Sequence, residues 1–353
     1  MSQIAQVFEN MNTKLCFLTL ALLLSSCSAP HFDGATLAGK AAILDNVNLL
    51  LSKGDCTGAV KGIEDLYSSV NTDNDVRMIR ASAHACRAGL SSYFSFTGKL
   101  ADPATNPIAS VPTEGAYFWR TMAKLFYAET TSGGSAVVDT NELNTRLQAA
   151  WNATDALLAA LIVPPSAVAL SNKINSGTNN VGSANASDRT VDSNLYLMYV
   201  AMANIGILED LYGYNASAPP DQSTFKKKKK LGSTALKPNG WETAADVDTY
   251  GCSYASGILN LKDAIGVVSA NLSSGGLKTA LTNISTILNN FDATCTAACT
   301  VCGFTCTECP RNLRNRDSCK VDATTSDDDI ARCAAAGMVT LIDTDTTVGW
   351  VGP

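Results

Sequence analysis

Apolar residues recur at helical spacing along most of this sequence, and this pattern limits the folds open to the chain. Residues 40–53, 56–69 and 76–88 each place apolar side chains three or four positions apart, and turn-forming residues separate these stretches. Runs with the two-residue period of a β-strand are few. We therefore expect an all-α fold whose short helices pack as antiparallel neighbours, because the turns between them are short.

The same spacing predicts further helices at residues 115–129, 141–161, 193–212, 254–271, 275–290 and 327–337. Residues 193–212 are apolar on nearly all sides, so we expect this helix to lie at the centre of the core. Two polar stretches, residues 171–190 and 214–240, are rich in Gly, Ser, Asn and Pro and are predicted to be surface loops. We expect a domain boundary in one of them.

The stretch LLLSKGDCTGAVKGIEDLY resembles a tetratricopeptide (TPR) repeat. Gly54 takes the turn between two helices, Ala59 takes the small position where they cross, and Ile63 and Leu66 lie on the packing face. Gly89 follows Gly54 at about the 34-residue period of that family. The resemblance implies TPR-like antiparallel helical hairpins that form an array, with a concave face for a partner and no catalytic residue.

The N-terminal stretch has the pattern of a secretory signal. Lys14 precedes an apolar run from Leu15 to Leu24, which is too short to cross a bilayer as a helix. The run ends in Leu-Ser-Ser-Cys, which resembles the lipobox of bacterial lipoproteins. The resemblance implies that residues 1–26 are a signal peptide and that Cys27 carries the lipid.

The same resemblance implies a location. In that family, an Asp after the lipidated cysteine favours the inner membrane, and this chain has Ser28 there instead. We therefore expect an outer-membrane lipoprotein that is anchored through its lipid and faces the periplasm. Residues 27–39 are interpreted as the tether that follows the anchor.

The balance of charge argues against nucleic acid as a partner. Acidic residues number 32 and basic residues 26, for a net charge of −6. One uninterrupted basic run stands out: Lys226, Lys227, Lys228, Lys229 and Lys230. We interpret it as a solvated loop tip, and the alternative is electrostatic contact with anionic headgroups or an acidic partner.

Catalytic motifs are not found in the sequence, and we expect neither an enzyme nor a bound cofactor or metal. The two histidines are His31 and His84, and the helical surroundings of His84 favour a packing role. Two pairs of adjacent acids in the middle of helices are interpreted as solvated: Glu64 with Asp65, and Glu209 with Asp210.

Two cysteines are predicted to form a disulfide on geometric grounds. Cys56 opens the second expected helix and Cys86 lies near the end of the third. Antiparallel packing brings them side by side, within the Cα separation of about 4.4–6.8 Å that a disulfide needs. Closing a loop of about 31 residues should stabilise the fold by about 3–4 kcal/mol.

The other feature rich in cysteine is the stretch CTAACTVCGFTCTECP, residues 295–310. Its spacing matches neither a ferredoxin nor a zinc ribbon. In an oxidising compartment it favours a disulfide-bonded irregular segment, with a thiolate metal site or a redox C-x₂-C pair as alternatives. The cysteines expected to share these disulfides are Cys252, Cys295, Cys299, Cys302, Cys306, Cys309, Cys319 and Cys333.

The mature chain is therefore expected to have three parts: a TPR-like region at 40–131, a helical body at 132–291 and a cysteine-rich segment at 292–353. Our main hypothesis is a membrane-anchored periplasmic lipoprotein that binds or scaffolds another protein through helical repeats, without catalysis. The first alternative is a ligand-binding lipoprotein of an uptake system with an apolar helical cavity. The second is a redox or metal protein that uses the cysteine cluster.

Overall fold

The structure is a computed structural model. It describes residues 32–90, 96–98, 100, 122, 125–126, 128–132, 135–158, 190–215, 225–227, 252–301, 314 and 316. The residues expected to form a signal peptide, Cys27 and the helix expected at 327–337 lie outside the described residues.

Helices dominate the described residues, which confirms the expected helical architecture. The helices are α2 (Leu37–Ser52), α3 (Cys56–Ser69), α4 (Asn74–Arg87), α7 (Thr140–Leu158), α9 (Val191–Tyr212), α11 (Cys252–Asn271) and α12 (Gly276–Val301). Four short strands form two antiparallel pairs: β1 (Glu129–Ser132) with β2 (Ser135–Val138), and β3 (Gly213–Asn215) with β4 (Phe225–Lys227).

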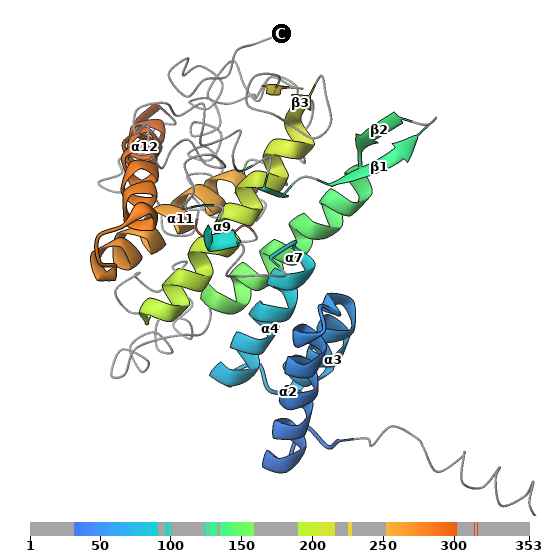
Figure 1. The fold of residues 1–353 in the computed structure, drawn as a ribbon. Helices are drawn as coiled ribbons and strands as arrows, with labels where there is room; N and C mark the ends of the chain where they lie inside the picture. Colours follow the sequence, from blue (N-terminus) through green and yellow to red (C-terminus); the bar gives the residue numbers. More distant parts are fainter. Residues whose placement is uncertain are drawn as a thin grey trace, which may run out of the picture.

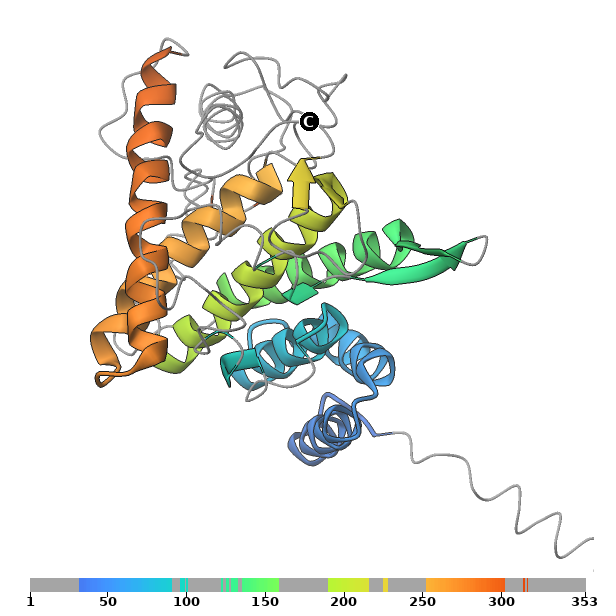
Figure 2. The ribbon, with the colours of Figure 1, turned by 45° about the horizontal axis from the view of Figure 1, so that its top comes forward.

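The helices follow one another across the molecule in the order of the chain. Each packs on the helix that follows it, from α2 through α3, α4, α7, α9 and α11 to α12. Figures 1 and 2 show this order as a progression of colour from blue α2 at one end to orange α12 at the other. The expected division at residue 131/132 falls inside β1, and α4 packs on α7 across it.

Local sequence explains where α2 and α3 begin and end. Thr36 caps α2 and accepts a hydrogen bond from the backbone N–H of Gly39 at 3.0 Å, so the helix starts within the stretch expected to be tether. Gly54 has a φ of +73°, a backbone conformation that favours glycine, and it ends the turn after α2. Asp55 then caps α3 by accepting from the N–H of Gly58 at 2.8 Å.

The cap of α4 also ties it to α2. Asp73 is the N-cap and accepts hydrogen bonds from the backbone N–H groups of Asp75 and Val76 at 2.9 and 3.3 Å. Its other carboxylate oxygen lies 2.6 Å from the Nζ of Lys40. This pair raises the pKa of Lys40 and lowers that of Asp73, chiefly through the hydrogen bond between them. Thus one side chain caps α4 and holds α2 in place.

Two hydrophobic clusters organise the described residues. The smaller joins α2, α3 and α4 through the buried residues Val47, Ala59, Ile63, Leu66, Val76 and Ala83. The positions that resemble a TPR packing face are thus buried, although the described residues do not establish a TPR repeat.

The larger cluster is centred on α9 and includes side chains of α4, α7, α11 and α12. Residues 191–208 are apolar and long enough to cross a bilayer, but 78% of this window is buried among neighbouring helices. Helix α9 is therefore a core helix, as its uniformly apolar sequence predicts.

Helices α9 and α11 cross closely at a glycine. A Cβ atom on Gly257 would lie 2.7 Å from the Nδ2 of Asn204 and 3.1 Å from the Cγ1 of Ile205. The same Nδ2 donates a hydrogen bond to the backbone oxygen of Ser253 at 2.8 Å. Because residue 257 has no side chain, the two helices can approach closely enough for this buried hydrogen bond to form between them.

Two expected elements at the hairpins are corrected. The helix expected at 115–129 is helical at Met122 and Phe126, but Glu129 already belongs to β1. Threonines and valines flank Gly133 and Gly134 in this stretch, and that composition favours a hairpin over a helix. The polar stretch 214–240, expected to be a loop, contributes β3 and β4, in which Tyr214 pairs with Lys226.

The cysteine-rich segment is also corrected at its start. Helix α12 extends to Val301, beyond the expected end at residue 290, so the backbone at Cys295 and Cys299 is helical rather than irregular. The physical reason is that no Gly or Pro interrupts residues 277–301, and the first helix breaker is Gly303. The remaining cluster cysteines lie outside the described residues.

Replacing Gly257 by Ala should lower the free energy of unfolding by about 1–3 kcal/mol, because the new methyl group overpacks the crossing of α9 and α11. Gly266→Ala on the same helix is the matched control, since a Cβ there meets nothing within 4 Å. It should stabilise the protein by about 0.5–1 kcal/mol through helix propensity. Urea unfolding of both variants measures the difference, and equal effects would contradict the close crossing.

Candidate binding groove

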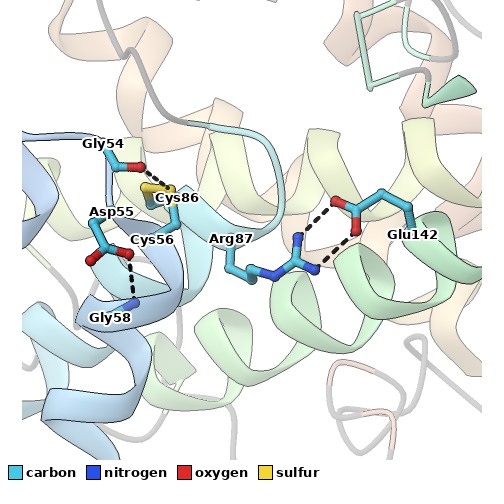
Figure 3. Close-up of a disulfide and its surroundings, with 7 residues drawn as sticks. All are labelled: Gly54, Asp55, Cys56, Gly58, Cys86, Arg87 and Glu142. Atoms are coloured by element: carbon cyan, nitrogen blue, oxygen red, sulfur yellow. Dashed lines mark hydrogen bonds and ion pairs between the residues drawn. A yellow bond between two sulfur atoms is a disulfide. The ribbon is translucent and has the colours of Figure 1, made fainter.

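A disulfide joins α3 to α4 at the pair predicted from the sequence. Cys56 and Cys86 are bonded with a Cα separation of 5.3 Å, which confirms this pairing. Figure 3 shows that Arg87, the next residue, points the other way and reaches Glu142 on α7. Helix α4 is therefore fixed to one neighbour by a covalent bond and to the other by an ion pair.

The ion pair between α4 and α7 is bidentate. The Nη1 and Nη2 atoms of Arg87 donate to the two carboxylate oxygens of Glu142 at 2.7 and 2.9 Å. Arg146, one turn further along α7, donates to the same carboxylate at 2.9 Å. These hydrogen bonds, from Arg87 first, lower the pKa of Glu142 to about 2, and the same contact raises the pKa of Arg87.

A second charged cluster holds α3 against α4. The Oε1 of Glu64 lies 2.6 Å from the Nε2 of His84 and 2.7 Å from the Nε of Arg80. The hydrogen bonds from His84 and then Arg80 lower the pKa of Glu64 to about 2. Because an ionised carboxylate can only accept, the Nε2 of His84 carries the proton.

Arg80 extends this cluster to α7. Its Nη1 donates to the backbone oxygen of Asn152 at 3.2 Å, and its guanidinium lies 4.1 Å from the ring centroid of Tyr67. The side chains of Arg80 and His84 are 9% and 5% exposed, whereas that of Glu64 is 38% exposed, so the carboxylate meets solvent on one side. One arginine therefore links three helices.

Helix α4 lies between α3 and α7, and residues of all three helices line a groove. The groove has a volume of about 500 Å³ and is lined by Thr57 and Val60 of α3, His84 and Arg87 of α4, and Asn144, Thr145, Gln148, Ala149 and Asn152 of α7. Most of the α7 wall carries amide or hydroxyl groups. The charged side chains at its base, His84 and Arg87, are paired with Glu64 and Glu142, and most of the exposed lining of the groove is apolar.

An apolar cavity near α9 is much smaller. It has a volume of about 20 Å³ and is lined by Ala85, Leu90, Phe96, Tyr196, Tyr199 and Val200. A space of this size holds about one water molecule. This cavity is therefore too small for a small-molecule ligand, and the alternative of a ligand-binding lipoprotein stays a hypothesis.

The sequence interpretation of two acidic residues was wrong. Glu64 was expected to be solvated and is instead bonded to Arg80 and His84, whereas its neighbour Asp65 is exposed. Asp210 was also expected to be solvated, and it is buried at 4% exposure. Their positions within the helices could not reveal which face meets a neighbouring helix. His84 packs between helices, as predicted.

The other candidate residues of the sequence lie away from the groove or outside the described residues. Lys226 and Lys227 belong to β4, not to a loop tip, and Lys228, Lys229 and Lys230 are outside. Cys252 is disulfide-bonded, with a partner that is not among the described side chains.

The metal and redox hypotheses concern the cysteine cluster. Among the described residues, no three His, Cys, Asp or Glu side chains gather as a metal site would require. The side chains of the cluster itself are not described, so a metal or redox role for it stays a hypothesis.

The groove residues on α7 were missed by sequence reasoning. Asn144, Gln148 and Asn152 recur at four-residue intervals, and this spacing places them on one helical face. That periodic polar stripe was the available signal. Its meaning depended on α3 and α4 lying opposite, which the stripe does not reveal.

Comparison with known proteins gives no match, so the interpretation of this site depends on its geometry. No protein-family model matches the chain, and no curated protein or solved structure matches it.

Glu64→Gln should lower the free energy of unfolding at pH 7 by about 0.5–1.5 kcal/mol, because Arg80 and His84 lose a charged acceptor that is itself partly screened by solvent. In the wild type, a pKa lowered from 4.5 to about 2 on folding adds stability above pH 4.5 that is lost as the pH falls toward 2. The variant should lack this part of the acid sensitivity. Urea titrations between pH 2 and 7 measure it.

Asp65→Asn is the control for this prediction, since Asp65 neighbours Glu64 in sequence and is exposed. It should change both quantities little. If both variants keep the acid sensitivity of the wild type, the Glu64 cluster does not stabilise the fold as described.

Proposed function

We propose that this chain is a lipoprotein of the outer membrane, anchored through Cys27, that binds another protein on the periplasmic side without catalysis. The observation that carries the proposal is the groove of about 500 Å³ between α3, α4 and α7. It is open, most of its exposed lining is apolar, and its walls are fixed by a disulfide and by ion pairs.

Rigid walls favour binding because a preformed site loses less conformational entropy when a partner arrives. The disulfide holds α3 on α4, and Arg87 with Glu142 holds α4 on α7. The order of the helices along the molecule supports the same proposal, since serial stacking creates extended concave surfaces in helical arrays. The TPR-like character of residues 40–131 is part of this proposal.

The electrostatics of the groove support binding over catalysis. Glu64 and Glu142 are the carboxylates held beside it, and the pKa of each is about 2. A general acid or base works best with a pKa near the operating pH. Neither carboxylate is suited to that role near neutral pH.

Site-specific photo-crosslinking in the native cell envelope tests the proposal. A photoreactive residue in place of Thr145, which lines the groove, should give a discrete adduct with one partner protein. The same residue in place of Asn141, exposed one turn earlier on α7 and outside the groove lining, should give none. Cys27→Ser should move the protein from the membrane to the soluble fraction.

Each part of the proposal can fail separately. Equal adducts from both positions, or none from either, would contradict the groove as the binding surface. A Cys27→Ser variant that stays in the membrane fraction would contradict the anchor.

A further inference from the structure

We infer that the N-terminal end of α2 inserts into the lipid surface beside the anchor, with its apolar side chains at the boundary between headgroups and acyl chains. The exposed side chains concerned, which we call the apolar end, are Phe32, Ala35, Leu37, Ala38 and Ala41. The inference rests on the proposed lipid anchor of this protein and adds a second contact with the same membrane.

Large apolar side chains that are exposed gather in one region of the described surface. Among the described residues there are four: Phe32 at 39%, Leu37 at 83%, Leu49 at 51% and Val191 at 39% exposure. The first three belong to α2 or to the five residues before it. Such a concentration of exposed apolar surface commonly marks a contact with a membrane or with another protein.

One side of α2 is open for such a contact. The helix packs on α3 and α4, and Figures 1 and 2 show it at the edge of the molecule. Gly39 and Val47 are the buried residues of α2, whereas Leu37, Ala38 and Ala41 are exposed. The apolar end therefore lies on a side of α2 that none of the described helices covers.

The charges near the apolar end fit a shallow insertion. The Nζ of Lys40 lies 2.6 Å from the carboxylate of Asp73, so this charge is already paired. Asp33 is exposed just before α2, and Asp45 is exposed further along the helix. Hydrated carboxylates keep a helix in the interface, where apolar side chains reach about 5–10 Å into the boundary of headgroups and acyl chains.

The position of the proposed anchor in the sequence favours the membrane as the occupant. Cys27 precedes Leu37 by ten residues, so the two can be no further apart than about 33–36 Å. A short connection between two contacts raises the effective concentration for the second to the order of millimolar. A small apolar contact that would be too weak alone can therefore form once the lipid is in place.

A second copy of the chain fits the apolar end less well. A stable protein–protein interface takes about 20–30 residues from each partner. The apolar end has five residues, and three of them are alanines. Insertion into lipid needs no matching surface, so a few apolar side chains suffice.

Fluorescence in reconstituted vesicles tests the inference. The full lipidated chain is placed in vesicles of phosphatidylcholine, which carries no net charge, and a fluorescent amino acid replaces either Ala41 or Asn46. Both residues are exposed on α2, but Asn46 lies outside the apolar end. Lipids with a nitroxide close to the headgroup should quench the probe at residue 41 at least about three times as strongly as the probe at residue 46.

Two matched substitutions show whether the probe itself drives the insertion. Leu37→Asp should reduce the quenching at residue 41 at least about threefold, because a charged group opposes transfer of the apolar end into lipid. Leu37 is 83% exposed, so this change removes little packing. Asn46→Asp adds the same charge to the same helix outside the apolar end and should leave the quenching unchanged. Circular dichroism checks that each variant is folded.

Three results would overturn the inference. They are equal quenching at residues 41 and 46, quenching at residue 41 that Leu37→Asp leaves unchanged, and shielding of residue 41 from water that depends on protein density without quenching by lipid. The last would show that a second copy covers the apolar end.

The inference and the proposed function can be separated. If one of these results occurs while Cys27→Ser still releases the protein and the residue-145 position still forms its adduct, the inference alone fails. If Cys27→Ser leaves the protein in the membrane fraction, the anchor fails and the inference fails with it.

Discussion

The position of α4 is the constraint on which the groove depends. Cys86 bonds it to α3, and the next residue, Arg87, binds Glu142 on α7. Adjacent residues of a helix point in different directions, so one short stretch can hold two neighbours at once. Both contacts lie near the C-terminal end of α4, and residues of α3, α4 and α7 line the groove.

The charged residues beside the groove are arranged so that its walls remain neutral. Glu64 and Glu142 each have two partners, and the low pKa of each keeps the carboxylate ionised and paired under ordinary conditions. Partly buried charges are stable only when they are paired and hydrogen-bonded. The same pairing leaves no unpaired charge among the described residues that line the groove, which connects the stability of this region to its proposed binding role.

The prediction from sequence succeeded where the physics is local. The bounds expected for α3 match the structure, and α7, α9 and α11 differ from expectation by a few residues at their ends. Helical spacing and turn glycines act over a few residues, so a single sequence reveals them. The errors arose where competing local signals were undervalued. The Thr- and Val-rich residues around Gly133 form a hairpin, and the residues before Gly303 continue α12.

The sequence by itself determined the helices, the core position of α9 and the pairing of Cys56 with Cys86, since these follow from periodicity and from the geometry of a short antiparallel hairpin. Only the tertiary structure decided that Glu64 is bonded while Asp65 is solvated, and that residues of α7 line the same groove as residues of α3 and α4. The reason is that such contacts join residues far apart in the chain. They depend on how each helix is rotated against its neighbour, and the pattern within one helix does not specify that rotation.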